Sequence, residues 1–305
     1  MSILVVGSVA FDAIQTPFGK VDRCIGGSAT YFSVAASFFA PVELVAVVGD
    51  DFSEDDASIF KGRNINIDGL QRVKGERSFF WSGEYGFDLN VAKTRDTQLN
   101  VFAGFKPQLN ERQRAADVLF LANIDPELQM DVLKQAKRPR LVALDTMNYW
   151  ISSKHEALER IFREVDLIII NEAEVRQFMK EANLVKAARA ILALGAKTLV
   201  IKRGEYGVLM VTRDAVFAAP AYPLENVFDP TGAGDTFAGG FLGYLASRQD
   251  ITDRELRRAI IFGSVLASFT VEKFSLDRLR EISLREVQER YADFRALTHF
   301  EDYDR

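Results

Sequence analysis

A glycine-rich turn that leads directly into a helix is the first place where this sequence could do chemistry. In DPTGAGDTFAGGFLGYLA (229–246), the small residues Gly232, Ala233 and Gly234 precede Asp235, and an apolar helical pattern follows. The first N–H groups of a helix lack intrahelical partners, and the helix dipole makes that end positive, so the turn can bind a phosphate. A neighbouring carboxylate can accept a proton from an attacking hydroxyl, as phosphoryl transfer requires. Spacing alone leaves an equal alternative, in which Asp235 only caps the helix.

The elements that must position this turn alternate between strands and helices. Near-continuous apolar runs are typical of parallel strands that are covered on both faces. Such runs occur at 3–7, 44–49, 118–123, 141–145, 167–170 and 198–202. Amphipathic helical patterns occupy 126–137, 154–164, 172–182 and 184–195, and the chain from about 233 onward reads as helical. This alternation predicts a doubly wound α/β fold with a mostly parallel sheet flanked by helices.

One segment interrupts that alternation. Residues 68–104 contain turn signals and little helical periodicity, so we expect antiparallel strands that stand apart from the main sheet, joined by a strand within 13–22. No repeat, low-complexity tract or linker divides the chain. We therefore expect a single domain over residues 1–305, with a small β-strand lid formed by segments at about 13–25 and 68–104.

Composition excludes several classes of function. The 305 residues carry a net charge of −5, which argues against a general nucleic-acid binder. One cysteine, Cys24, allows no intrachain disulfide and fits a reducing cytoplasm. The N-terminus lacks the pattern of a signal peptide, and no apolar run approaches the length of a membrane span. The two histidines, His155 and His299, lie in polar surroundings, and we expect them on the surface rather than in a catalytic or metal site.

The 229–246 stretch resembles the C-terminal signature of the ribokinase-like (PfkB) carbohydrate kinases, and it matches the Asp-x-Thr-Gly-Ala-Gly-Asp core without departure. Further parts of the family pattern follow in the expected order over nearly the whole chain. They are GSVAFD (7–12), GGSAT (26–30), VVGDD (47–51), LDTMN (144–148), NEAE (171–174) and KRGEYG (202–207).

The resemblance implies roles on the phosphoryl-transfer side of the site. Asp235 would be the general base, and the N–H groups of Gly232, Ala233 and Gly234 would form the anion hole. Asn171 and Glu174 would act on Mg²⁺ and phosphate through water, although the residues alone fit a plain helix-capping pair equally well. Asp229 and Thr231 match positions that help to hold a monovalent cation such as K⁺ in many members, against the plainer interpretation of a loop aspartate and a turn threonine.

The same resemblance places the nucleotide. Gly204 and Gly207 would shape a loop near ATP. Lys202 stands where the family often has Thr; its ammonium group could reach a phosphate or could equally be solvated. Gly263, within FGSVLASF (262–269), lies in the region that lines the adenine in relatives, although small helical residues more often serve packing.

On the acceptor side, Asp12 follows a buried strand, where ligand sites of α/β sheets collect, and its carboxylate could accept from two adjacent hydroxyls. Gly26 and Gly27 would bring the backbone close to the substrate. Tyr31 occupies the position where many sugar kinases carry Asn. This departure argues against transferring a ribose or fructose specificity directly.

The 68–104 segment corresponds to the lid of the family, which would exclude water from the reaction. Its aromatic cluster either forms lid core or a contact between two lids, or meets an apolar part of the substrate. The cluster consists of Phe79, Phe80, Trp81 and Tyr85. A homodimer through the lid is a further expectation.

Together these features predict an ATP-dependent, Mg²⁺-requiring kinase that phosphorylates a primary hydroxyl of a small polyhydroxylated substrate, with no nucleic-acid or membrane partner. A carbohydrate is the first choice of acceptor and a nucleoside the second. A non-catalytic sugar-binding regulator with the same fold is a rival. The absence of a G-x-G-x-x-G motif after the first strand disfavours a dehydrogenase, and the absence of a Walker A motif excludes the P-loop class.

Overall fold

A nine-stranded sheet forms the centre of the computed structural model, which describes residues 1–299 and 301. The strands lie in the order β13-β12-β11-β10-β9-β8-β1-β4-β5, and all neighbours pair in parallel except β11–β12 and β12–β13. Their bounds are β1 Ile3–Val6, β4 Val42–Gly49, β5 Ile65–Val73, β8 Val118–Leu121, β9 Leu141–Asp145, β10 Leu167–Asn171, β11 Thr198–Lys202, β12 Val208–Thr212 and β13 Val216–Ala219. The mostly parallel sheet is confirmed.

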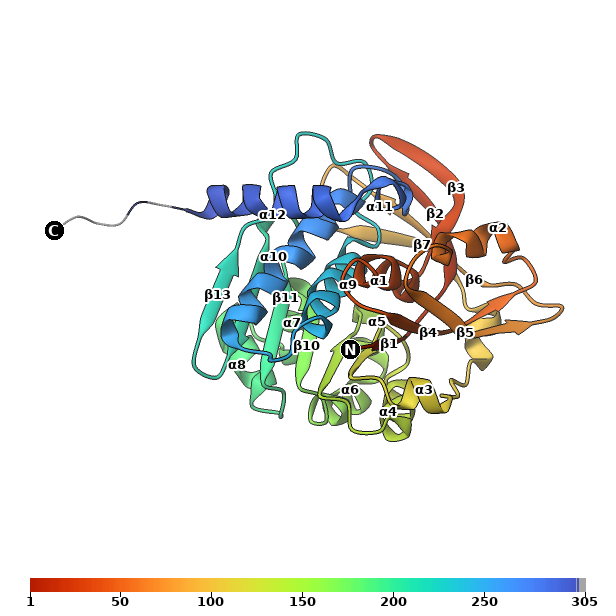
Figure 1. Ribbon diagram of the computed structural model, residues 1–305, viewed down its shortest axis with the longest axis horizontal. Coiled ribbons are helices and arrows are strands. Elements are labelled where there is room, and N and C mark those ends of the chain that lie inside the picture. Colours follow the sequence, from red (N-terminus) through yellow and green to blue (C-terminus); the bar gives the residue numbers. More distant parts are fainter. Residues whose placement is uncertain (300, 302–305) are drawn as a thin grey trace.

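Helices cover both faces of this sheet, because alternate strand residues point to opposite sides (Figure 1). One core contains Ile3 and Val5 of β1 and is covered by α1 (Ser28–Ala36), α9 (Ala233–Ala246) and α10 (Asp253–Thr270). The other core contains Leu4 and Val6. It is covered by α4 (Pro126–Gln135), α6 (His155–Phe162), α7 (Glu172–Met179) and α8 (Leu184–Leu192). The doubly wound arrangement is therefore confirmed, and each of these last four helices ends two or three residues before its predicted end.

A second sheet of four strands, which we call the lid sheet, stands apart from the main sheet in the order β3-β2-β6-β7. Its strands are β2 Ala10–Thr16, β3 Gly19–Gly26, β6 Phe79–Tyr85 and β7 Ala92–Gln98. The antiparallel strands expected within 68–104 are present as β6 and β7, but the start of that segment was placed wrongly. Residues 68–73 belong to β5 of the main sheet, where Leu70 packs against the core. The expected strand within 13–22 corresponds to β2 and β3, which pair antiparallel with each other, and β2 joins β6 in parallel.

The remaining elements are short, apart from the last helix. They are α2 Glu54–Ala57, α3 Glu111–Arg114, α5 Asn148–Ser153, α11 Asp277–Glu281, α12 Leu284–Thr298, and the 3₁₀ turns Ser58–Phe60, Asn100–Gly104 and Gly204–Tyr206. No helix in the described residues is long and apolar enough to cross a membrane.

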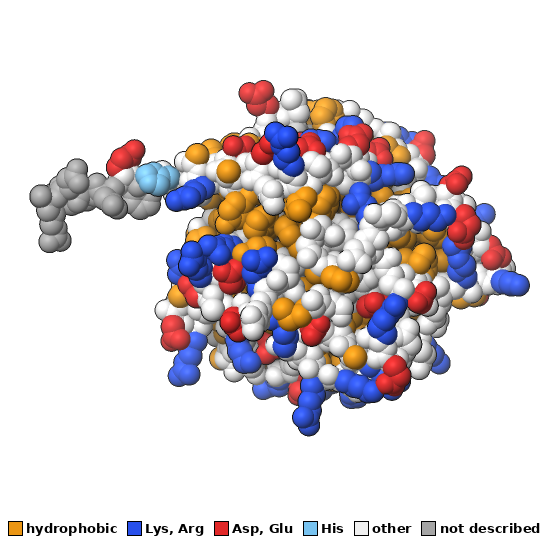
Figure 2. All heavy atoms as spheres, viewed as in Figure 1, with side chains coloured by type: hydrophobic (Ala, Val, Ile, Leu, Met, Phe, Trp, Pro, Cys, Tyr) orange, Lys and Arg blue, Asp and Glu red, His pale blue; other side chains and the backbone are white. Residues whose placement is uncertain are grey.

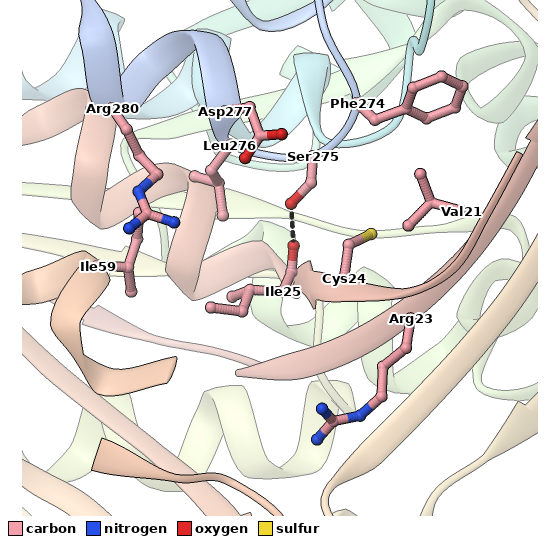
Figure 3. A pocket seen from close by; sticks show the side chains of 10 residues that line it. All are labelled: Val21, Arg23, Cys24, Ile25, Ile59, Phe274, Ser275, Leu276, Asp277 and Arg280. Carbon is pink, nitrogen blue, oxygen red and sulfur yellow. Dashed lines mark hydrogen bonds between the residues drawn. The ribbon is translucent and has the colours of Figure 1, made fainter. Parts of the chain in front are cut away.

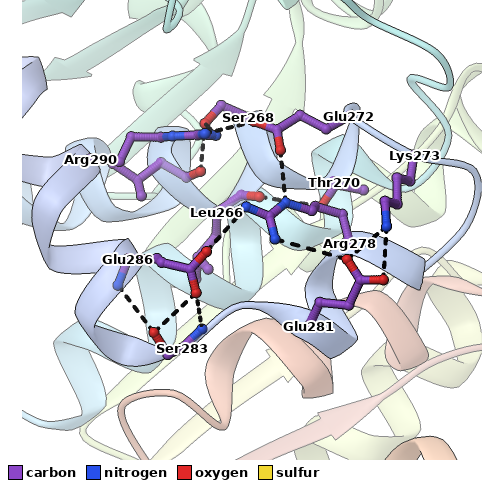
Figure 4. Close-up of polar contacts among 11 residues, drawn as sticks. Leu266, Ser268, Thr270, Glu272, Lys273, Arg278, Glu281, Ser283, Glu286 and Arg290 are labelled. Atoms are coloured by element: carbon purple, nitrogen blue, oxygen red, sulfur yellow. Dashed lines mark hydrogen bonds and ion pairs between the residues drawn. The ribbon is translucent and has the colours of Figure 1, made fainter.

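Helix α12 is fastened to the C-terminal end of α10 by a network of ion pairs (Figure 4). Arg290 lies 2.6 Å from a carboxylate oxygen of Glu272 and donates to Ser268 at 2.9 Å, while its guanidinium lies over the ring of Phe269. Arg278 pairs with Glu272 and Glu286. Elsewhere acidic and basic side chains are interspersed over the face seen in Figure 2.

Candidate active site

The turn at residues 232–234, which precedes α9, has a conformation that suits an anion site, and we call it the anion turn. Gly232 precedes the helix with φ 74°, in the left-handed region, and a Cβ atom there would lie 2.4 Å from the ring of Tyr31. The N–H of Ala233 donates to the carbonyl of Pro230 at 3.2 Å. The N–H groups of Gly232 and Gly234 donate to no backbone carbonyl in the described part of the chain, so they stay available to a ligand.

Asp235 lies in the first turn of α9, beside those N–H groups. Burial raises the pKa of its carboxyl to about 7; the charge of Asp145 adds to the rise and that of Lys202 opposes it. A carboxyl that titrates near neutrality has the basicity that suits a general base.

Asp12, on the lid sheet, is near enough to Asp235 for the charge of Asp235 to affect its pKa. It lies on β2 with 4% of its surface exposed, and burial, followed by the charges of Asp229 and Asp235, raises its pKa to about 8. A Cβ atom on Gly26 would lie 1.9 Å from an oxygen of Asp12, so the glycine makes room for this carboxylate. Gly27 has φ 96°, and a Cβ atom there would meet the carbonyl oxygen of Ser8 at 2.5 Å. Gly26 therefore leaves space for the carboxylate of Asp12, and Gly27 leaves space for the backbone of Ser8.

Tyr31 is packed beneath the α9 turn. It lies on α1, is 1% exposed, and its ring fills the space beside Gly232. Burial and then the charges of Asp229 and Asp12 raise the pKa of its hydroxyl, which has no hydrogen-bond partner in the described residues. Tyr31 thus supports the anion turn from below, and its contact with substrate stays a prediction.

A buried group of charges lies on the other side of the turn. Lys202, at the end of β11, donates to Asp145 at 2.6 Å, and a Cβ atom on Gly234 would lie 3.1 Å from its Nζ atom. Burial works against the ammonium charge, but Asp145, Glu174 and Asp235 outweigh it and raise the pKa of Lys202. This lysine is therefore a fixed positive charge next to the anion turn instead of a solvated side chain. The sequence offered LDTMN as a family element, but Asp145 was not among the predicted site residues.

Asn171 and Glu174 form a capping box at the start of α7. The amide oxygen of Asn171 accepts from the Glu174 N–H at 2.8 Å, and the Asn171 N–H donates to Glu174 at 2.9 Å. Glu174 is 7% exposed, and burial together with the charge of Asp145 raises its pKa to about 7. The pair therefore caps α7, as the plainer interpretation expects. The buried carboxyl of Glu174 also lies near Asp145 and Lys202.

Asp229 ties the anion turn to a neighbouring loop. It is fully buried, and its two oxygens accept from the N–H of Thr231 at 2.9 Å and of Ser275 at 3.0 Å. Burial raises its pKa against the effect of these bonds. Within residues 1–299, no group of three or more His, Cys, Asp or Glu is placed to hold a metal ion by itself.

The remaining predicted nucleotide residues have different surroundings. Gly207 has φ 88°, and a Cβ atom there would collide with the carbonyl oxygen of Ala219. Gly204 has φ 56°, and a Cβ atom there would lie 1.9 Å from the side chain of Asn90 in the loop between β6 and β7. Gly263 lies in α10 against the backbone of Phe237 in α9, so the structure gives it a packing role and does not bring it into the site.

A cavity of 290 Å³ lies behind β3, next to the acceptor side of the site (Figure 3). Ser275, which binds Asp229 through its N–H, donates from its hydroxyl to the carbonyl of Ile25. Cys24 lines the same cavity and pairs with Asp12 across the two strands. Burial and the charge of Asp12 raise the pKa of the thiol to about 12, so Cys24 is a neutral packing residue and not a nucleophile.

The site thus combines the turn before α9 with two buried carboxyls, Asp235 and Asp12, whose pKa values are raised to about 7 and about 8. Residues 2–281 match the sequence profile described as pfkB family carbohydrate kinase. The chain belongs to this family. As a pfkB kinase it is a phosphotransferase with a hydroxyl acceptor.

Individual relatives of this pfkB kinase include nucleoside kinases. A cytidine kinase of Thermococcus kodakarensis is 31% identical over 256 residues, which cover 81% of this chain and 90% of the relative. The structure of a nucleoside kinase of Methanocaldococcus jannaschii superposes with a TM-score of 0.77 at 22% identity, covering 96% and 98% of the two chains. A putative ribokinase II from E. coli, in complex with ATP and Mg²⁺, gives a TM-score of 0.77 at 17% identity and covers 96% and 99%. These structural likenesses show the ribokinase-like fold.

Proposed function

We propose that this pfkB kinase transfers the γ-phosphoryl group of ATP to the primary hydroxyl of a nucleoside. One observation carries the choice of acceptor: Trp81 on β6 is the register partner of Asp12 on β2. Register partners on neighbouring strands lie on the same face, about 5 Å apart. A carboxylate that binds a diol therefore stands next to a large aromatic surface, and a nucleoside has a diol at its ribose and a flat base beside it.

The ring of Trp81 is held in one place. A Cβ atom on Gly83 would lie 2.0 Å from the ring, so the indole covers Gly83, and the indole N–H donates to Thr94 at 3.2 Å. An immobilised ring can stack on a base at little cost in conformational entropy. The similarity to a cytidine kinase supports the same acceptor class.

In the transfer step, Asp235 takes the proton of the primary hydroxyl. The hydroxyl oxygen then forms its bond to the γ-phosphorus while the bond to the β–γ bridging oxygen breaks and ADP leaves. The free N–H groups of Gly232 and Gly234 stabilise the charge on the transferring group, and Lys202 adds a positive charge beside them.

The buried carboxyls near Lys202 suit a divalent cation. Asp145 and Glu174 are both buried, and the charge of Asp145 raises the pKa of Glu174. A cation bound between the two carboxylates, directly or through water, would relieve the repulsion between them. Asn171 would orient Glu174 through the capping box. Bound Mg²⁺ would supply charge neutralisation for the phosphates of ATP. Asp229 and Thr231 are proposed as ligands of a monovalent cation that shapes the anion turn.

A small carbohydrate, the first choice from sequence, is the second candidate. The family description favours it, and Asp12 with the backbone at Gly26 and Gly27 would bind its hydroxyls. A free sugar has hydroxyls on nearly every edge, and those facing Trp81 would lose their hydrogen bonds at about 1–3 kcal/mol each.

The test measures ATP-dependent turnover of cytidine, adenosine, inosine, ribose and fructose by the wild-type chain and by Trp81→Ala. We expect kcat/KM for the best nucleoside to fall tenfold or more in the variant, while turnover of any sugar barely changes. Phe87→Ala serves as the control, because Phe87 is an aromatic residue of the β6–β7 loop that is 93% exposed. Equal losses on nucleoside and sugar would contradict a base contact, and no turnover of either class at millimolar levels would overturn the function.

A further inference from the structure

Three contacts of the lid sheet and its loops with the C-terminal half of the chain lie at the Gly204–Tyr206 turn and in the stretch that leads into α9. The β2–β3 turn places Phe18 edge-on against Phe228, with ring centroids 6.2 Å apart. Tyr85, at the end of β6, is bonded to Thr231. Asn90, in the loop between β6 and β7, contacts the 3₁₀ turn at Gly204–Tyr206.

The Asn90 contact is made by both ends of its amide. Its Nδ2 atom donates to the carboxylate of Glu205 at 2.9 Å, and its Oδ1 atom accepts from the Glu205 N–H at 3.2 Å. Asp88 accepts from the Asn90 N–H at 3.0 Å and from its Nδ2 at 3.1 Å, which fixes the orientation of the amide. Gly204 leaves the space for Asn90 that a Cβ atom would fill. The Gly204–Tyr206 turn therefore has a conformation that accommodates Asn90 of the β6–β7 loop, in addition to its proposed role beside the nucleotide.

The Tyr85 contact reaches the anion turn itself. The hydroxyls of Tyr85 and Thr231 lie 3.2 Å apart, and the Thr231 N–H is in turn bonded to Asp229. Burial chiefly, and also the nearby charges of Asp229, Asp12 and Asp235, raise the pKa of Tyr85. This lid-sheet side chain thus lies near both Asp12 and the proposed base Asp235.

From these two contacts we infer that Asn90 and Tyr85 are positioning residues. They make closure of the lid sheet depend on the two donor-side loops, which are the Gly204–Tyr206 turn and the anion turn with Thr231 before it. The inference rests on the proposed function for its consequence. A nucleotide that stabilises the Gly204–Tyr206 turn in this conformation favours its contact with Asn90, and Tyr85 closes on Thr231 in the same movement. Water is then excluded from ATP only when the lid sheet and the donor loops meet.

The first arm of the experiment needs no turnover. Trp81 and Trp150 are the two tryptophans, so Trp150→Phe leaves Trp81 as the only fluorescent indole, in the lid sheet. In this background, Asn90→Ala and Tyr85→Phe should each raise acrylamide quenching of Trp81 about twofold, and Phe87→Ala should not. Mg-ADP should lower quenching in the parent and in Phe87→Ala, but not in Asn90→Ala. Thermal melts check that every variant is folded.

The second arm measures phosphoryl transfer to water and to acceptor. Asn90→Ala and Tyr85→Phe should raise the ratio of ATP hydrolysis to acceptor phosphorylation about five- to tenfold, with the KM of the acceptor raised more than kcat is lowered. Quenching that matches Phe87→Ala, or an unchanged hydrolysis ratio, would overturn the inference. If the wild type phosphorylates no acceptor, the proposed function fails, and the response of Trp81 to Mg-ADP alone still decides the coupling.

Discussion

The Nζ atom of Lys202 lies 2.6 Å from Oδ2 of Asp145, and this buried ion pair stands beside Gly234, at the opening of the anion turn. The side chain of Lys202 is 18% exposed and that of Asp145 is 4% exposed, so solvent screens the pair weakly. A buried pair is costly to break, because the charge that remains is buried without its oppositely charged partner. Without Lys202, the Asp145 carboxylate would remain near Glu174 and Asp235, two further acidic groups whose pKa values it raises.

Lys202→Met should therefore lower both stability and kcat. We expect a loss of about 3–5 kcal/mol in the free energy of unfolding and about 10²-fold in kcat. Lys202→Met combined with Asp145→Asn should recover most of the stability and none of the kcat. Chemical denaturation and steady-state kinetics on the single and double variants separate the two effects. Full recovery of kcat in the double variant would show that Lys202 only neutralises Asp145.

Asp235→Asn should lower kcat by about 10²–10⁴, the usual scale for loss of a general base. The KM of the acceptor should change much less, because the base acts mainly in the transition state. Since burial raises the pKa of Asp235 to about 7, wild-type kcat should fall as the pH drops below 7, where the carboxyl is protonated. A variant that keeps more than a tenth of wild-type kcat would rule out this role.

Asp12→Asn should stabilise the ligand-free chain at alkaline pH. The pKa of Asp12 is raised from 3.8 to about 8 in the folded state, so the folded chain binds more protons than the unfolded chain between these values. The contribution of Asp12 to stability is therefore fully present below pH 4 and is lost as the pH rises through 8. Urea midpoints of wild type and variant should diverge steadily over this range. The variant should also fail to bind acceptor, and parallel midpoints at all pH values would contradict the buried carboxyl.

Activity should be higher in K⁺ than in Na⁺ if Asp229 and Thr231 help to hold a monovalent cation. Both oxygens of Asp229 already accept backbone N–H groups, but a carboxylate has further lone pairs for a cation. The comparison requires matched ionic strength and saturating Mg²⁺. Thr231→Val should reduce the difference between the two salts. Equal rates of the wild type in both salts would count against the cation.

The sequence predicts the main sheet well because its strands are buried on both faces and read as unbroken apolar runs, as in LIII at 167–170. It fails at β5, where half-buried residues alternate with polar ones and look like a strand outside the sheet, and it predicts no strand at β12 or β13. Among the site residues, Asp12, Asp235 and Lys202 could be found because each follows a strand or opens a helix. Asn90 could not, because its partner Glu205 is 115 residues away in the chain and nothing in either loop signals the contact.

Strand β1 lies inside the main sheet, between β4 and β8. During synthesis, β4 follows β1 closely and can pair with one of its edges at once. The other edge stays open until Leu121 of β8 has left the ribosome. An open edge with the sequence ILVV is a template for pairing with another chain. Between the emergence of β4 and that of β8, the nascent chain therefore exposes an apolar strand edge that can pair with another chain.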